Sequence, residues 1–289
     1  HEEVTTYEVN DEDGSYIGIF YLDMHPRSTK RGGAWMNNYR DQYVLNGKNI
    51  NPIIGVVCNF TKPTGDMPAL LTYDEVETFF HEFGHALQGF LSKCSYKSTS
   101  GTNVSRDYVE LPSQIMENWA GEPEVMAFYA KHYKTGEIIP QELLDKMDKS
   151  SKFNQGFTTT EYLAACYLDM AYYTRTETLT QNPIAYEDKV LSDIGLIPEI
   201  ISRYKSTYFN HIFNSGYSAG YYSYIWAQVL DADAFQAFVE NGIFDKKTAK
   251  LYRDNVLAKG ANGDPMDNYV AFRGKKPTID ALLKRKGMQ

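Results

Sequence analysis

The chain has 289 residues, of which 43% are hydrophobic and 23% charged, and its formal net charge is −8. That length suffices for one large or two small globular domains with a sizeable core. The acidic balance, without a dense lysine or arginine cluster, excludes the usual footprint of a nucleic-acid-binding protein. No apolar run reaches the roughly 18 to 20 residues of a membrane span. We therefore expect neither a nucleic-acid partner nor a membrane partner.

The first part of the chain predicts a small sheet. Segments 16–24 and 53–60 are apolar, β-branched and aromatic, and turn-forming residues bound them, so each predicts a strand. The polar, glycine-rich stretch 25–42 predicts a loop, and two prolines and a glycine interrupt the segment 61–72.

The rest of the chain predicts helices almost to its end. The apolar periodicity places them at about 73–91, 112–133, 140–155, 158–180, 197–213, 218–241, 246–258 and 277–286. The expected fold class is therefore mainly α with a small β-sheet (α+β). Residues 1–72 would supply the sheet and loops, and residues 73–289 the helical part.

The helix predicted at 73–91 has a clear beginning and one buried face. Thr72 and Glu75 form the T-x-x-E pattern of a capping box. Apolar residues then recur from Val76 to Leu91 at the i, i+3, i+4, i+7 spacing of an amphipathic helix.

This helix carries the stretch 78-TFFHEFGHALQ-88. Four residues turn a helix through about 400°, so His81 and His85 project to the same side, one turn apart. Two imidazoles placed in this way can bind one tetrahedral metal ion, and Glu82 can reach a water on that metal. This is the H-E-x-x-H pattern of two zinc ligands and a general base. Two unrelated surface histidines are the alternative, but the match lies on a helix that other features predict independently.

A catalytic zinc usually has three protein ligands, so a later segment must supply one more. In the stretch 101–123, Pro112 suits the first turn of a helix. Glu110 lies at the start of that helix and Glu117 lies two turns later on the same face. Asp107 is a further candidate, either as a ligand or as a residue that orients an imidazole. By residue chemistry alone, Glu110 and Glu117 are equally eligible.

A tyrosine-rich segment, 217-YSAGYYSYIW-226, follows a glycine-containing loop, with His211 just upstream. Aromatic residues at helical spacing usually pack in a core. The alternative is that tyrosine hydroxyls and a histidine donate hydrogen bonds to an oxyanion during amide hydrolysis.

Several of these segments together resemble one enzyme family. HEFGHALQG (81–89), SGTNVSRDYVELPSQIMENW (100–119) and HIFNSGYSAGYYSYIWAQVLDADAF (211–235) resemble the zinc peptidases thimet oligopeptidase, neurolysin and bacterial peptidyl-dipeptidase (dipeptidyl carboxypeptidase). YLDMHPRSTKRGGAW near the start and AFRGKKPTIDALL near the end extend the resemblance over nearly the whole chain. The tyrosine segment is most similar to the peptidyl-dipeptidase branch.

The resemblance implies a ligand set. The glutamate of VELPSQ is the third zinc ligand in that family, which corresponds to Glu110, so Glu117 becomes a supporting residue. Gln88 stands where the family often has a histidine that is not a ligand. The implied fold is a zincin-type catalytic lobe, residues 1–289, with the H-E-x-x-H helix next to the sheet.

The resemblance also implies roles for the tyrosine segment. Tyr217 and Tyr224 match positions that stabilise the transition state, and Tyr221 matches a substrate-binding position. His211 lies where the family has its active-site histidine.

The implied activity is that of a zinc metallopeptidase with one Zn²⁺ ion and Glu82 as general base. Short peptides would be the substrates and C-terminal dipeptides the products. An endo-acting oligopeptidase is one alternative, and a metal-binding lobe that is inactive without an N-terminal half is another. Family members have a further helical lobe, which would precede His1 as a partner. Three separated cysteines, without a C-x-x-C pair, favour a reducing compartment, so the cytoplasm is expected first and the periplasm second.

Overall fold

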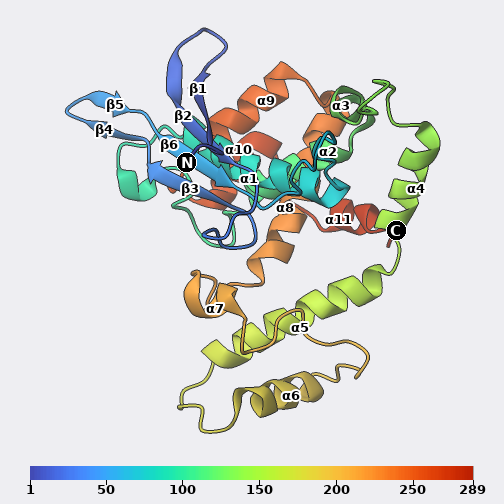
Figure 1. Cartoon of the computed structure of the whole chain (residues 1–289). Coiled ribbons are helices and arrows are strands. Elements are labelled where there is room, and N and C mark those ends of the chain that lie inside the picture. The colour runs from blue at the N-terminus through green and yellow to red at the C-terminus, as the bar shows by residue number, and fades with distance from the viewer. Residues whose placement is uncertain (289) are drawn as a thin grey trace. The chain divides into compact units, whose positions relative to one another are not determined.

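The computed structural model describes residues 1–288 and has the expected class, mainly helical with a small sheet near the N-terminus (Figure 1). The chain divides into two compact units. The first unit comprises His1–Leu144 and Ala227–Leu282, and the second comprises Asp145–Trp226 and the chain from Leu283 onward.

The sheet of the first unit has four strands in the order β1-β2-β6-β3. Their bounds are β1 Thr5–Asn10, β2 Tyr16–Asp23, β3 Trp35–Arg40 and β6 Ile53–Val57. β2 and β6 are parallel, whereas β1 and β3 run antiparallel to their neighbours and form the two edges. A separate hairpin joins β4 (Tyr43–Leu45) to β5 (Lys48–Ile50). Its two turn residues, Asn46 and Gly47, both have positive φ, as tight hairpin turns require.

Helix α1 (Tyr73–Leu91) has the predicted bounds, and both hydrogen bonds of the predicted capping box between Thr72 and Glu75 are present. The helix lies against the sheet, which confirms the expected placement of the H-E-x-x-H helix (Figure 1). The ring of Phe20 from β2 lies 5.9 Å from that of Phe83 and 5.5 Å from that of Phe90. The face of α1 that carries Phe83 and Phe90 therefore lies on the sheet, and the remaining faces of the helix point away from it.

The opposite side of α1 packs on α2 (Leu111–Gly121), and the approach is unusually close at Gly84. A Cβ atom on Gly84 would lie 2.2 Å from the carbonyl oxygen of Pro112 and 2.6 Å from the Cα of Ser113. Only glycine fits at this position. The close contact brings the start of α2 beside the two histidines of α1.

The remaining helical elements of the first unit are η1 (Lys97–Thr99), α3 (Pro123–Tyr129), α9 (Lys246–Tyr252), the π-helical turn η2 (Arg253–Leu257) and α10 (Pro265–Arg273). Its second apolar core joins Leu111 and Ile115 of α2 to Leu230 and Phe235, which lie far along the chain. Within residues 1–288, no helix is both long enough and apolar enough to cross a bilayer.

The second unit contains α5 (Gln155–Tyr173), α6 (Pro183–Asp193) and α7 (Asn210–Asn214). Three helices cross the boundary between the units: α4 (Gln141–Ser151), α8 (Ser223–Asn241) and α11 (Asp280–Arg285). The core of this unit joins Leu168 of α5 to Phe209, Ile212 and Tyr221.

Several details differ from the sequence prediction. The stretch 25–42, predicted as a loop, contains edge strand β3, and the helix predicted at 112–133 ends and restarts at Glu122. The helix predicted at 197–213 is wrong except for α7. Strands β1, β4 and β5 and helices α6 and α10 were not predicted.

Candidate metal centre

Three predicted ligands converge in the first unit. Helix α1 places the rings of His81 and His85 with their centroids 5.0 Å apart and their planes at 85°. Glu110 precedes the first residue of α2, and its Oε2 lies 3.3 Å from Nε2 of His81 and 3.2 Å from Nε2 of His85. These three residues form the one group found among residues 1–288 that could hold a metal ion.

The two separations between Glu110 and the imidazoles fit a tetrahedral zinc ion. With zinc bonds of about 2.0 to 2.1 Å, neighbouring ligand atoms of a tetrahedron lie about 3.3 Å apart. Both measured separations between imidazole nitrogen and carboxylate oxygen agree with that value. The donor set, two imidazoles and one carboxylate, is one that catalytic zinc sites use.

Glu110 is 2% exposed and has a second interaction. The hydroxyl of Ser113, one turn further along α2, lies 2.9 Å from its Oε2 and can donate to it. Burial would raise the pKa of Glu110, but the neighbouring imidazoles of His85 and His81 outweigh burial and hold the pKa well below its ordinary value. The carboxylate is therefore anionic, as a metal ligand must be.

Glu117 contacts the other nitrogen of His81. Its Oε1 lies 2.5 Å from Nδ1, on the ring side away from Glu110. Burial alone would lower the pKa of His81, but the two carboxylates outweigh burial and raise it well above its ordinary value. A carboxylate on Nδ1 orients the ring and leaves Nε2 for a metal.

His85 has no such support. Its Nδ1 is buried and has no hydrogen-bond partner within the described chain. The two imidazoles therefore differ in their surroundings, although they lie one turn apart on the same helix.

Glu82 points into the same region and is 6% exposed. Burial raises its pKa above the ordinary value, while the imidazoles of His81 and His85 act in the opposite direction. Its Oε2 is buried and makes no hydrogen bond within residues 1–288. A buried carboxylate of raised pKa near two candidate metal ligands has the properties expected of a general base.

The second unit gathers the predicted residues of the tyrosine segment. The rings of Tyr217 and Tyr224 stack with centroids 5.2 Å apart, and the ring of His211 lies 6.1 Å from Tyr217 and 6.4 Å from Tyr224. Tyr221 is 3% exposed and packs against Phe209 with ring centroids 5.0 Å apart. His211, Tyr217, Tyr221 and Tyr224 thus form one aromatic cluster, whose catalytic roles stay predictions.

Sequence reasoning missed two supporting residues, Ser113 and Asp169. Ser113 lies three residues after Glu110 and shares its helix face, a spacing that could have indicated it. Asp169 lies about 50 residues before the tyrosine segment, on α5, and accepts hydrogen bonds from its backbone. No local pattern relates an acid to a turn so far along the chain.

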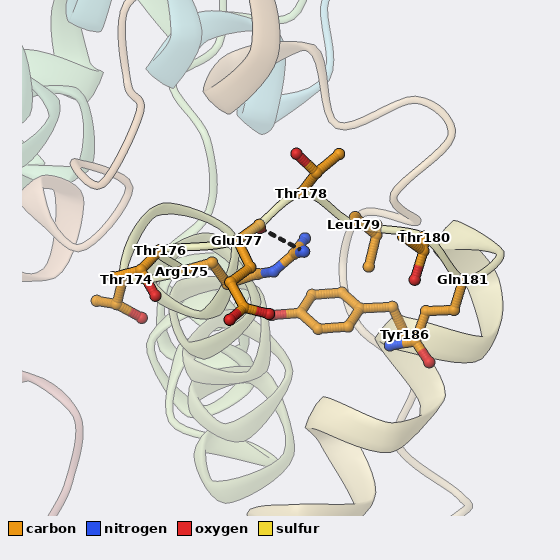
Figure 2. Close-up of a pocket in the computed structure, with 9 residues that line it drawn as sticks. All are labelled: Thr174, Arg175, Thr176, Glu177, Thr178, Leu179, Thr180, Gln181 and Tyr186. Atoms are coloured by element: carbon orange, nitrogen blue, oxygen red, sulfur yellow. Dashed lines mark hydrogen bonds between the residues drawn. The ribbon is translucent and has the colours of Figure 1, made fainter.

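The second unit also has an open pocket of about 420 Å³ (Figure 2). The loop 174–181 and Tyr186 of α6 line it. The guanidinium of Arg175 lies 5.1 Å from the ring centroid of Tyr186 and donates to the carbonyl oxygen of Glu177. None of the residues predicted for the catalytic site lines this pocket.

Comparison with known proteins gives a consistent result. The model of peptidase family M3 matches residues 1–288. Dipeptidyl carboxypeptidase from Salmonella typhimurium is 43% identical over 100% of this chain, which covers 42% of that protein. Oligopeptidase A from Escherichia coli is 40% identical over 100% of this chain, which covers 43% of that protein. The chain therefore spans less than half the length of these curated relatives.

A solved structure, that of BsuCP, matches 93% of this chain and 54% of its own length with a TM-score of 0.55. At 15% sequence identity, this likeness concerns the fold alone.

Proposed function

This chain belongs to peptidase family M3, and on that basis we propose that it is the catalytic part of a zinc metallopeptidase acting on short peptides. The observation that carries the proposal is the convergence of His81, His85 and Glu110, whose ligand atoms lie within 4.8 Å of one another and whose two imidazole–carboxylate separations have tetrahedral values, with Glu82 buried nearby. A purely structural zinc usually has four protein ligands and does not need a neighbouring general base.

The four residues have separate tasks in this proposal. His81, His85 and Glu110 would hold the ion, which would supply Lewis acidity for the scissile carbonyl and for the attacking water. Glu82 accepts the proton of the attacking water and delivers it to the leaving amine. Glu117 keeps the ring of His81 in the orientation that binding requires.

The proposal extends to the aromatic cluster of the second unit. Hydroxyl donors from Tyr217 and Tyr224, together with His211, would stabilise the negative charge that grows on the carbonyl oxygen. Tyr221 would contribute to substrate binding. The support for these roles is the family membership and the ordered packing of the four rings.

Edge strand β3 is the proposed guide for the substrate. It pairs with β6 along one side only and lies at the boundary of the sheet. An extended peptide can pair with such an edge through backbone hydrogen bonds, which suits an enzyme that accepts varied side chains.

We propose release of C-terminal dipeptides as the reaction, because dipeptidyl carboxypeptidases are among the similar proteins, at 43% and 42% identity. Endo-acting cleavage is the second candidate, because relatives named oligopeptidase A are nearly as similar, at 40%. We place the reaction in the cytoplasm, since all three cysteines are free and buried, with the periplasm as second choice.

The test compares wild type with Glu82→Gln on one peptide, prepared with a free and with an amidated C-terminus. We expect Glu82→Gln to retain zinc and to lose cleavage by about 10²- to 10⁴-fold, because the amide cannot accept the proton. Cleavage of the free peptide alone supports dipeptide release, and equal cleavage of both supports an oligopeptidase.

Two other outcomes would contradict the proposal. A Glu82→Gln variant as active as wild type would sink the assignment of the general base. Zinc binding without cleavage, even after addition of the helical lobe that the family resemblance implies, would favour a non-catalytic metal-binding lobe.

A further inference from the structure

One buried acid, Asp169, accepts hydrogen bonds from the backbone of the turn 217–221, which belongs to the tyrosine segment. Asp169 lies on α5, in the second unit, and is 0% exposed. Its Oδ1 accepts the backbone N–H of Ala219 at 2.9 Å, and its Oδ2 accepts that of Tyr221, also at 2.9 Å. Burial raises the pKa of Asp169, while the N–H groups of Tyr221, Ala219 and Gly220 counteract it. Two backbone donors of the turn, the N–H groups of Ala219 and Tyr221, thus point at one carboxylate.

The turn needs this support because its backbone is strained. Ala219 has a φ of +52°, a left-handed conformation that costs a residue with a Cβ about 1 kcal/mol or more. A carboxylate with two oxygens can accept the N–H of Ala219 itself and that of Tyr221, two residues later, at once, which offsets that cost.

Further side-chain hydrogen bonds reach a carbonyl group of this turn and a carbonyl group of the neighbouring helix α7. The hydroxyl of Tyr162, also on α5, donates to the carbonyl oxygen of Tyr221 at 2.5 Å. The hydroxyl of Ser218 donates to the carbonyl oxygen of Ile212 at 2.6 Å, and that of Tyr173 donates to the same atom at 2.5 Å. Helix α5 therefore fixes the turn 217–221 and the end of α7 together.

We propose that Asp169 is a positioning residue, which fixes the conformation of the turn 217–221 and thereby the directions of the Tyr217 and Tyr224 hydroxyls. The catalytic purpose of this arrangement rests on the proposed function. The hydrogen bonds that define it lie wholly within the second unit and do not depend on the metal.

Glu187 offers a matched control for a merely structural role. It is also 0% exposed, lies on α6 in the same unit, and accepts hydrogen bonds from the backbone N–H and the hydroxyl of Ser206. It also pairs with Lys205 at 2.7 Å. Its replacement removes a buried carboxylate of the same unit that makes no hydrogen bond to the backbone of the turn 217–221 in the described residues.

The experiment compares Asp169→Asn with Glu187→Gln in the full chain by amide hydrogen exchange and steady-state kinetics. The Asn side chain presents an NH₂ group where an acceptor is needed, so exchange at the amides of Ala219 and Tyr221 is expected to accelerate. We expect kcat to fall by about 10- to 100-fold, because misplaced catalytic groups cost rates of that order. KM should change by less than about threefold and zinc content should stay at the wild-type level, since the metal ligands and β3 are untouched. Glu187→Gln should leave these two amides and kcat near wild-type values.

Three results would overturn the proposal: unchanged exchange at Ala219 and Tyr221, faster exchange without a fall in kcat, or an equal fall in kcat in Glu187→Gln. If Asp169→Asn does not fold, Tyr162→Phe loosens the same turn from its carbonyl side and should show the same pattern to a smaller degree. Failure of the proposed function is recognised separately, by Glu82→Gln cleaving as well as wild type. The hydrogen bonds of Asp169 would then have no catalytic purpose. The exchange rates at Ala219 and Tyr221 would still decide whether Asp169 fixes the turn 217–221.

Discussion

At the scale of residues, Glu110 and Glu117 illustrate what spacing can and cannot decide. Both acids lie on the same face of one predicted helix, so residue chemistry alone left them equal. The structure distinguishes them by the imidazole nitrogen that each one faces, with Glu110 near both Nε2 atoms and Glu117 on Nδ1 of His81. That difference arises from how α2 packs on α1, which the sequence of either helix alone does not contain.

Ser113 gives a prediction at this scale. The change Ser113→Ala removes a hydroxyl 2.9 Å from Oε2 of Glu110, and a supporting group of this kind typically accounts for 10- to 100-fold in metal affinity. We therefore expect zinc affinity to fall by about tenfold or more, measured by titration against a chelator of known affinity. Ser151→Ala, at an exposed hydroxyl at the end of α4, is the control and should bind zinc like wild type. Equal zinc affinities in Ser113→Ala and Ser151→Ala would show that the Ser113 hydroxyl does not support the metal ligand Glu110.

At the scale of elements, prediction succeeded where several local signals agreed. The bounds of α1 followed from a capping box and an apolar repeat that indicate the same helix. Strand β3 was missed because its sequence, WMNNYR, is polar. As an edge strand it pairs with β6 alone, so its side chains need not follow the apolar pattern of a central strand. In the segment 197–213 only α7 forms, and the backbone N–H of Ser206 donates to the side chain of Glu187 instead of to a helical carbonyl.

The close contact between α1 and α2 gives a prediction for this scale. Because a Cβ on Gly84 would meet backbone atoms of Pro112 and Ser113, Gly84→Ala must separate the two helices. Overpacking of this kind costs about 1 to 3 kcal/mol of unfolding free energy, measured by denaturant titration. Zinc affinity should fall as well, because Glu110 would move away from the two histidines.

Gly156 is the matched control for that substitution. It lies in helix α5, and a Cβ there would meet no atom within 4 Å. Gly156→Ala should therefore leave zinc affinity unchanged and raise stability by up to about 1 kcal/mol, through the unfolded state. A Gly84→Ala protein as stable as wild type would show that the helices tolerate separation.

At the scale of the whole molecule, the mainly helical class with a small sheet was predictable, because strand and helix patterns occupy different parts of the chain. The discontinuous first unit was not predictable from local patterns. It joins residues 1–144 to 227–282 through contacts such as those of Leu111 and Ile115 with Leu230 and Phe235. Local periodicity indicates which faces are apolar, but it does not indicate which distant face will cover them.

The division also separates two parts of the proposed mechanism. The metal ligands and Glu82 belong to the first unit, whereas the aromatic cluster and Asp169 belong to the second. Variants of the first group should therefore affect zinc binding, and variants of the second should affect turnover without loss of zinc.

The central claim is that His81, His85 and Glu110 hold one zinc ion. Metal content measured by mass spectrometry on wild type, Glu110→Gln and Glu117→Gln tests it most directly. We expect near-stoichiometric zinc in wild type, loss of zinc in Glu110→Gln, and zinc retained at reduced affinity in Glu117→Gln. Zinc retained in Glu110→Gln, or a wild-type protein that binds none after loading, would contradict it.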